Sequence, residues 1–208
     1  MPVSRVESVN VGESREVAWR GRAVSTGIWK HPVGDRPVAV RGVNLAGDDQ
    51  ADRAVHGGPD KAVYAYSAED YQYWRDEAQL ETPFGLFGEN LTTTGVSLTH
   101  AVVGEQWRVG SALLEVVQPR LPCYKLGVRM NDPGFPRRFM AAGRPGAYLR
   151  IVQEGELRRG DRIEVVERPA HGITLRNMME ALADPQRAAD LRTLPRLPTW
   201  WQQFVGPE

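Results

Sequence analysis

Residues 112–126 read Ala-Leu-Leu-Glu-Val-Val-Gln-Pro-Arg-Leu-Pro-Cys-Tyr-Lys-Leu, and they join an apolar strand pattern to the only cysteine of the chain. The apolar and β-branched residues of 112–117 predict a β-strand. Pro119 and Pro122 restrict the backbone beyond it, so the sulfur of Cys123 should be held in one place. The stretch therefore predicts a strand that is followed at once by a fixed thiol.

Cys123 has three open roles. A single cysteine cannot form an internal disulfide, so it is a small buried hydrophobe, a reactive thiol, or one thiolate ligand of a metal whose other ligands come from elsewhere. Arg120 and Lys125 stand on either side of it and would favour the thiolate over the thiol. This setting favours the two chemical roles over the role of buried filler.

Short β-rich runs separated by glycine and proline continue on both sides of this stretch. They cover residues 3–11, 16–26, 37–43, 106–109, 148–153 and 162–167. Two helices are expected among them, one from a capping box at Ser67 to Leu80 and one between Gly134 and Ala142. Many short strands at this spacing predict a mainly β fold, an antiparallel barrel or sandwich with a few short helices.

The composition changes after Arg168-Pro169, where Leu, Met, Ala and Arg replace the strand formers. Helix-start signals stand at Thr174, Asp184 and Thr199. They predict three short helices. We therefore predict a β-barrel domain over residues 1–168 and a C-terminal three-helix extension over residues 169–208. The aromatic residues of this tail also lead us to expect a homodimer.

The charges of the chain argue against several classes of partner. The 208 residues carry 26 basic and 26 acidic side chains, so no overall field attracts nucleic acid or an anionic membrane. No apolar stretch approaches the roughly 20 residues that cross a bilayer, and the first residues lack the apolar core of a signal peptide. We expect a cytoplasmic protein with a free thiol.

Residues 55–64, Val-His-Gly-Gly-Pro-Asp-Lys-Ala-Val-Tyr, could form an anion cradle. Gly57 and Gly58 would let backbone N–H groups approach a ligand closely, while His56 and Lys61 add donors and positive charge. A tight turn that leads into the next strand would use the same glycines and proline. The local spacing leaves these two interpretations equal.

Two further loops carry polar side chains next to glycines. In residues 84–91, Glu89 and Asn90 could hydrogen-bond a polar heterocycle, although the pattern alone favours a β-turn into a strand. In residues 143–148, Arg144 could bind a phosphate or lie in a surface turn. If the loops meet at one end of the barrel, their cations form a local basic pocket on a neutral protein. These cations are Lys61, Arg120, Lys125, Arg137, Arg138 and Arg144.

Taken in order, these motifs resemble those of the MOSC domain family, named for the C-terminal domain of molybdenum cofactor sulfurase, and within it the YiiM-like branch with a C-terminal three-helix extension. The resemblance implies a MOSC-type β-barrel and a molybdenum cofactor (molybdopterin with Mo); no pyridoxal phosphate is expected. It implies that Cys123 is the protein ligand to molybdenum and the catalytic residue. The implied cofactor contacts are His56, Gly57, Gly58, Lys61 and Asn90, with Arg144 added from its charge and its place in a loop.

Similar proteins that keep this cysteine reduce N-hydroxylated compounds, such as hydroxylaminopurines, amidoximes and hydroxamic acids, to the parent amine or amide. The resemblance thus implies a molybdenum-dependent oxidoreductase that acts on a small molecule and whose cofactor performs the difficult step. Proton delivery could fall to His56 or to Glu89. Electrons are expected from a separate flavin or iron–sulfur reductase, because the chain has no Rossmann glycine fingerprint and too few cysteines for a cluster.

Two other functions stay open at this point. In the first, the protein binds the cofactor to carry, store or insert it and catalyses nothing. In the second, Cys123 passes on a persulfide as a sulfur carrier and no metal is bound.

Overall fold

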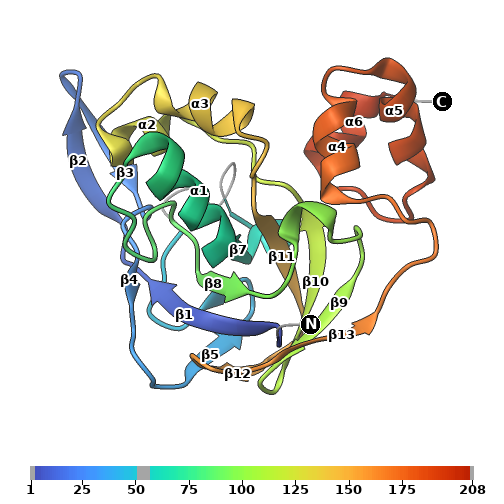
Figure 1. Cartoon of the computed structure of the whole chain (residues 1–208), viewed down its shortest axis with the longest axis horizontal. Helices are drawn as coiled ribbons and strands as arrows, with labels where there is room; N and C mark the ends of the chain where they lie inside the picture. Colours follow the sequence, from blue (N-terminus) through green and yellow to red (C-terminus); the bar gives the residue numbers. More distant parts are fainter. Residues whose placement is uncertain (1–2, 51–56, 207–208) are drawn as a thin grey trace.

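The computed structural model describes residues 3–50 and 57–206, except for the side chains of residues 77 and 78. Its main sheet has eight strands in the order β13-β9-β10-β11-β7-β8-β1-β4 and curls into a half-barrel (Figure 1). These strands are β1 (Arg5–Val11), β4 (His31–Pro32), β7 (Val63–Ser67), β8 (Leu91–Thr94), β9 (Gln106–Val109), β10 (Ala112–Gln118), β11 (Ala147–Gln153) and β13 (Ile163–Glu167). The expected mainly β, barrel-like fold is confirmed.

Two smaller sheets complete the β structure. One contains β12 (Gly155–Leu157), β5 (Val38–Arg41) and β6 (Asn44–Leu45) in that order. The other is the hairpin of β2 (Arg15–Trp19) and β3 (Arg22–Thr26). The run predicted over residues 16–26 is therefore two strands, because Arg20 and Gly21 adopt positive φ angles of 50° and 75° and turn the chain back on itself.

One pair of neighbours in the main sheet departs from the expected antiparallel order. β7 and β8 run parallel, with Ala65 opposite Leu91. Helix α1 (Ala68–Ala78) connects the end of β7 to β8, and a parallel pair needs a crossover of this kind. The antiparallel expectation is wrong for this pair and correct for the other neighbours of the sheet.

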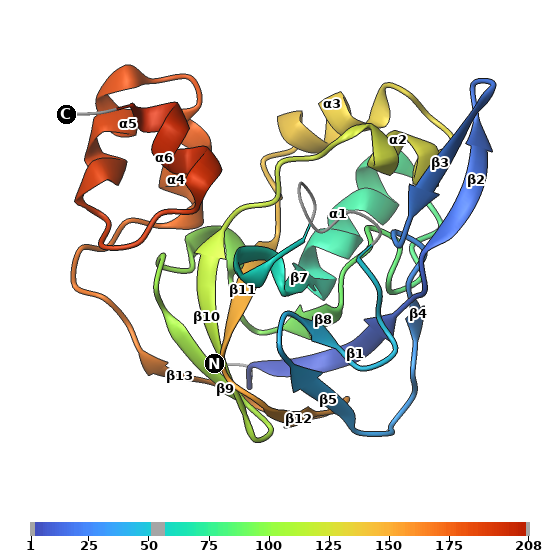
Figure 2. The ribbon, with the colours of Figure 1, turned by 180° about the vertical axis from the view of Figure 1, so that it is seen from behind.

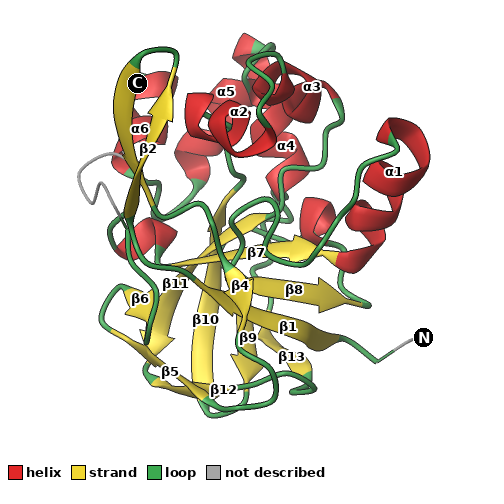
Figure 3. Ribbon diagram, turned by 90° about the vertical axis from the view of Figure 1, so that its left-hand side faces the viewer, coloured by secondary structure: helices red, strands yellow, loops and turns green. Residues whose placement is uncertain are grey.

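The helices gather on one side of the strands (Figure 3). Helix α1 begins as predicted, because the backbone N–H of Asp70 donates to Ser67 Oγ at 3.0 Å. Helix α3 (Phe135–Ala141) lies within the second predicted range. Helix α2 (Tyr124–Met130) was not predicted, since it has only seven residues and Gly127 interrupts its periodic pattern. It begins directly after Cys123.

The C-terminal segment forms the three predicted helices, α4 (Leu175–Ala181), α5 (Pro185–Asp190) and α6 (Thr199–Val205). Thr174 begins α4 with a capping box to Asn177. Leu175, Met178 and Trp201 from these helices belong to the same hydrophobic core as the sheet residues Trp107 and Leu149. The domain division at residue 168 stays a prediction, and so does the homodimer. None of the described helices has the length and apolarity that a membrane crossing requires.

Candidate functional site

Cys123 lies in the wall of a pocket that six separate segments of the chain build. The lining residues are Thr26, Gly27, Ile28, Lys30, Asp48, Asp49, Gln50, Lys61, Tyr64, Gly88, Asn90, Arg120, Leu121, Cys123, Lys125 and Tyr148. The loops after β3, β6 and β10 and the ends of β7 and β11 therefore meet here. Of the residues predicted from sequence, the pocket brings together Cys123, Lys61 and Asn90 with the cations Arg120 and Lys125.

The thiol of Cys123 is partly exposed, in a polar setting. Arg120 is buried beside it, donates to the backbone carbonyl of Phe87, and lies 4.8 Å from the ring centroid of Tyr64. The guanidinium is close enough to Cys123 for their charges to interact, and Tyr148 is close to both. Burial raises the pKa of the Tyr148 phenol and the Arg120 charge opposes this rise, so the phenol keeps its proton and can donate it in a hydrogen bond.

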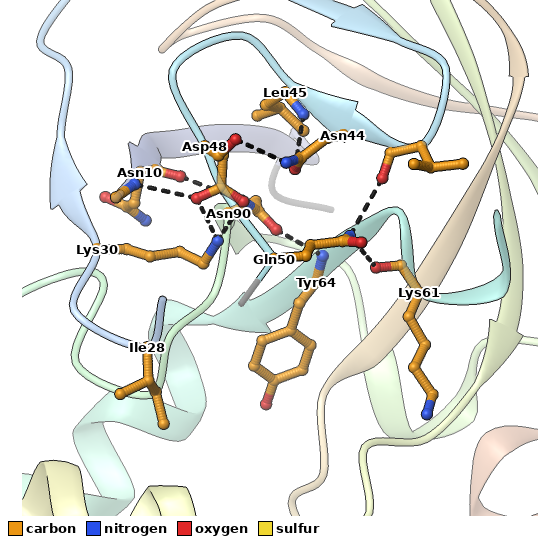
Figure 4. Close-up of polar contacts among 12 residues, drawn as sticks. Asn10, Ile28, Lys30, Asn44, Leu45, Asp48, Gln50, Lys61, Tyr64 and Asn90 are labelled. Carbon is orange, nitrogen blue, oxygen red and sulfur yellow. Dashed lines mark hydrogen bonds and ion pairs between the residues drawn. The ribbon is translucent and has the colours of Figure 1, made fainter. Parts of the chain in front are cut away.

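The Gly-Gly-Pro loop is a short, well-supported turn that reaches the Cys123 pocket through Lys61, whereas Gly57 and Gly58 do not line it. Gly58 has φ 89°, a left-handed conformation that glycine adopts readily, and the 3-10 turn Pro59–Lys61 follows. Gln50 holds both ends of the turn. Gly58 N donates to Gln50 Oε1 at 3.2 Å. Gln50 Nε2 donates to Lys61 O at 3.2 Å, a bond that Figure 4 shows. Gly57 is also described, whereas His56 lies outside the described residues.

Asn90 is part of a buried polar network. Its Oδ1 accepts from Tyr64 N at 3.1 Å, and its Nδ2 donates to Asp48 Oδ2 at 2.9 Å. Asp48 also pairs with Lys30 (Figure 4). The side chain of Asp48 is 1% exposed and that of Lys30 is 9% exposed. Burial lowers the pKa of Lys30, while the Asp48 carboxylate opposes this shift. Asn90 therefore supports the pocket wall in this structure, and its contact with a cofactor stays a proposal.

Glu89 does not line the pocket, although Gly88 and Asn90 on either side of it do. Its fully buried Oε1 accepts from Tyr71 OH at 2.5 Å, Gly85 N at 2.6 Å and Thr92 Oγ1 at 2.9 Å. Its Oε2 is buried without a hydrogen-bond partner in the described structure. This placement gives no support to Glu89 as a proton donor for the pocket, and it indicates a structural role between α1 and β8.

The burial of Glu89 predicts a pH-dependent stability. Burial raises the pKa of this carboxyl above its usual 4.5, and the hydrogen bond from Tyr71 only partly opposes the rise. Between the unfolded pKa and the raised folded pKa the folded protein binds more protons, so its free energy of unfolding falls as pH rises. Urea unfolding at a series of pH values should show this fall, and Glu89→Gln should flatten it. An equal slope in the wild type and the variant would assign the pH dependence to other groups.

Arg144 lies away from Cys123. Its Nη1 pairs with Asp70 Oδ1 at 2.5 Å, and its guanidinium lies 4.5 Å from the ring centroid of Tyr73. It lines a different pocket, of about 900 Å³, between α1, α3 and α4. Arg137 and Arg138 are exposed on α3 and line neither pocket. The structure thus brings three of the six expected cations to the Cys123 pocket and gives no support to a cofactor contact at Arg144.

A chain of hydrogen bonds links the C-terminal helices to the Gly-Gly-Pro loop. Trp201 Nε1 on α6 donates to Gln118 Oε1 at 3.0 Å, and Gln118 Nε2 donates to the backbone carbonyl of Asp60 at 3.2 Å. The Asp60 carboxylate accepts from Arg150 Nε at 3.0 Å, and Arg150 also pairs with Glu115. Because Gln118 ends β10, α6 supports both the Gly-Gly-Pro loop and the segment that leads to Cys123.

Trp201→Phe is expected to lower the free energy of unfolding by about 1–3 kcal/mol, because the buried Gln118 acceptor loses its donor and the smaller phenyl ring leaves part of the indole's space unfilled. Trp200→Phe is the matched control, since Trp200 is 47% exposed and should change the value by less than about 0.5 kcal/mol. Urea unfolding measures both. Equal losses in the two variants would show that the hydrogen bond to Gln118 contributes little.

The pocket suits a metal that carries most of its own ligands. No group of three or more His, Cys, Asp or Glu side chains gathers as a metal site in residues 3–50 and 57–206. A metal at Cys123 would therefore have one described protein ligand, and a soft thiolate suits a metal that is otherwise bound by sulfur. The cations Arg120, Lys61 and Lys125 around the thiol suit an anionic cofactor. Both features fit a molybdenum–pterin group with its own dithiolene and phosphate.

Proteins of similar sequence are found in bacteria and fungi. YflK of Bacillus subtilis, an uncharacterized protein, is 35% identical over 170 residues, which cover 82% of this chain and 76% of YflK. A protein named Reductase from Gibberella moniliformis is 35% identical over 153 residues, which cover 72% of this chain but only 27% of the relative. The matched region is thus a small part of that longer protein.

The fold and the family model agree with these relatives. The crystal structure of YiiM from Geobacillus stearothermophilus superposes with a TM-score of 0.79 at 28% identity and covers 97% of both chains. The MOSC domain model matches residues 52–164, which include the Gly-Gly-Pro loop, Asn90 and Cys123. The resemblance seen in the sequence motifs is confirmed, and the chain belongs to the MOSC domain family as a YiiM-like member.

Proposed function

We propose that this protein binds a molybdenum cofactor through Cys123 and reduces N-hydroxylated small molecules to the parent amine or amide. The observation that carries the proposal is the partly exposed thiol in a pocket lined by Arg120, Lys61 and Lys125. A thiolate with several cations nearby suits a soft metal in an anionic organic cofactor. The fungal relative named Reductase supports a reductive activity.

The residues of the pocket have distinct proposed roles. Cys123 would ligate the metal, and Lys61 with the backbone N–H group of Gly57 would bind the anionic end of the cofactor. Gly58, whose own N–H donates to Gln50, would contact the cofactor through the close approach that a glycine backbone permits. His56 and Asn90 are further proposed contacts from the family motifs. Arg120 would stabilise the thiolate, and Tyr148 would donate a hydrogen bond to an oxygen of the substrate. When bound, the cofactor supplies an acceptor for the oxygen atom of the N–O bond.

Each turnover of this reaction consumes two electrons and two protons and releases one molecule of the parent amine or amide and one water. The product water has to leave the pocket for the solvent. The partial exposure of Cys123 is compatible with such an exit. The electrons are proposed to come from a separate flavin or iron–sulfur protein. His56 is the remaining proposed proton donor from the sequence, since Glu89 does not line the pocket.

The test is to express the protein in a host that makes the cofactor and to measure molybdenum, pterin and reduced-dye-driven reduction of 6-hydroxylaminopurine. About one molybdenum per chain together with turnover supports the reductase. Molybdenum without turnover on hydroxylaminopurines, amidoximes or hydroxamic acids would favour a cofactor carrier. Protein that repeatedly lacks metal under cofactor-replete, anaerobic conditions, but carries a persulfide on Cys123, would favour the sulfur carrier.

A further inference from the structure

Three cations form a line from the pocket to the β2–β3 hairpin. Lys125 lines the pocket near Cys123, and Arg129 follows four residues later, so the two lie on one face of α2. The Arg129 guanidinium lies 5.6 Å from the ring centroid of Trp29, and the Arg15 guanidinium lies 4.2 Å from the same centroid. We call Lys125, Arg129 and Arg15 the basic stripe. Helix α2 lies beside the hairpin in Figures 1 and 2.

No carboxylate among the described residues forms an ion pair with a cation of the basic stripe. The ion pairs of residues 3–50 and 57–206 involve other cations, and Arg129 Nε is buried without a hydrogen-bond partner. Burial lowers the pKa of Arg129, Tyr71 and the buried carboxyl of Glu89 oppose this shift, and the nearby Arg15 charge adds to it. Like charges four residues apart on a helix are mildly destabilising as well. A negatively charged partner would relieve this repulsion.

The α2 part of the stripe lies in a basic segment although the whole chain is neutral, whereas Arg15 on the hairpin has the exposed Glu13 and Glu16 as sequence neighbours. Residues 120–144 contain six basic side chains and one acidic side chain, whereas the chain has 26 of each. The six are Arg120, Lys125, Arg129, Arg137, Arg138 and Arg144, and the acid is Asp132. Asp132 is already paired with Arg138 at 3.3 Å. Of these six cations, Arg120 and Lys125 line the Cys123 pocket and Arg129 lies on the same helix as Lys125, whereas Arg144 pairs with Asp70 away from Cys123.

Tyr124 adds an exposed aromatic side chain at the same place. It is 57% exposed and is bonded directly to Cys123 in the chain. A partner that covered Tyr124 and the basic stripe would therefore bring its own redox centre close to the proposed metal ligand. A small anion would need donors that converge on one point, whereas the stripe extends over two elements and suits a protein surface.

We propose that the basic stripe and Tyr124 are the docking surface for an acidic electron-transfer protein that carries a flavin or an iron–sulfur cluster. The proposal rests on the proposed function, because that reaction needs two electrons per turnover. Redox partners form small, transient interfaces whose association is steered by complementary charge. The association should therefore weaken as salt screens the stripe.

The test compares two electron donors for the same cofactor-loaded enzyme. Reduced methyl viologen is a small donor that needs no docking surface, and a flavodoxin with its NADPH-dependent reductase is the acidic protein donor. The variant is Arg15→Glu/Arg129→Glu. The matched control is Arg36→Glu/Arg41→Glu, which changes the charge equally at two exposed residues in and next to β5, on the opposite side of the molecule from α2 (Figure 1).

We expect the stripe variant to lose at least about tenfold in kcat/KM for flavodoxin at low salt, while its dye-driven rate stays within about twofold of the wild type. The control variant should keep both rates. Arg15→Glu alone, at an exposed side chain, is the second variant in case the change at Arg129 impairs folding. Equal flavodoxin kinetics in the stripe and control variants would overturn the docking surface, and so would a dye-active wild type that accepts no electrons from flavodoxin.

A direct binding measurement separates this proposal from the proposed function. Titration calorimetry with oxidised flavodoxin requires no turnover, so it tests docking even if the dye assay shows no activity. Salt-sensitive binding that the stripe substitutions abolish supports the docking surface, and binding that they leave unchanged contradicts it. Absence of dye-driven turnover contradicts only the proposed reductase activity.

Discussion

Cys123→Ser is expected to lower reductase turnover by at least about 100-fold and to remove most of the bound molybdenum. Changes in groups that only orient a metal ligand typically cost 10–100-fold, and Cys123 would be the ligand itself. A hydroxyl is a harder and less acidic donor than a thiol, so it replaces the thiolate poorly. Metal analysis and the dye-driven assay on the same preparation measure both effects.

The fold should tolerate this substitution. Cys123 is partly exposed and Ser is nearly isosteric, so the free energy of unfolding should change by less than about 1 kcal/mol. Tyr124→Phe is a matched control at the adjacent position, because it leaves the thiol unchanged and should retain dye-driven turnover. Full molybdenum content and full activity in Cys123→Ser would remove the metal-ligand assignment.

The sequence predicted best those features that depend only on residues close together in the chain, such as turns and helix caps. Glycine at position 58 has a positive φ, Ser67 caps α1, and Thr174 caps α4, and each of these features shows directly in a short motif. Cys123 stood out because it is the only cysteine and follows a strand pattern. Short motifs of this kind depend on neighbours in the chain, so they can be read without the fold.

The rest of the site depends on contacts between distant segments. Lys30 and Asp48 pair across 18 positions, and neither belongs to a recognisable motif. Gln50 supports the Gly-Gly-Pro loop from outside that motif. The sequence signal that could have suggested them is modest: each polar residue lies close to glycines in a region that otherwise predicts short strands.

Arg144 lies in a place that its loop did not indicate. Its loop leads into β11, whose Tyr148 does line the Cys123 pocket, but the guanidinium pairs with Asp70 at the start of α1. Sequence proximity could not indicate which side of the strand the arginine would face. Only the placement of α1, which follows from the parallel β7–β8 crossover, decides it.

Lys30→Met is expected to lower the free energy of unfolding by about 3–5 kcal/mol. The substitution removes the charge partner of Asp48, whose side chain is only 1% exposed. Among the described residues, the other partners of that carboxylate are Gly12 N at 3.0 Å and Asn90 Nδ2 at 2.9 Å, and neither carries a charge. An unpaired buried carboxylate must then be protonated or hydrated, and both disturb the wall that holds Asn90 and Tyr64.

The double variant Lys30→Met/Asp48→Asn separates the lost charge pair from lost packing. Its neutral amide leaves no unpaired charge, so it should recover at least half of the stability that Lys30→Met loses. Arg41→Met, at an exposed residue, should change the free energy of unfolding by less than about 0.5 kcal/mol. Urea unfolding of the three variants provides the comparison. Two results would contradict this role of the pair: a loss of less than about 1 kcal/mol in the free energy of unfolding of Lys30→Met, or a double variant that is no more stable than the single one. Asn90 would then be held by its hydrogen bonds to the backbone alone.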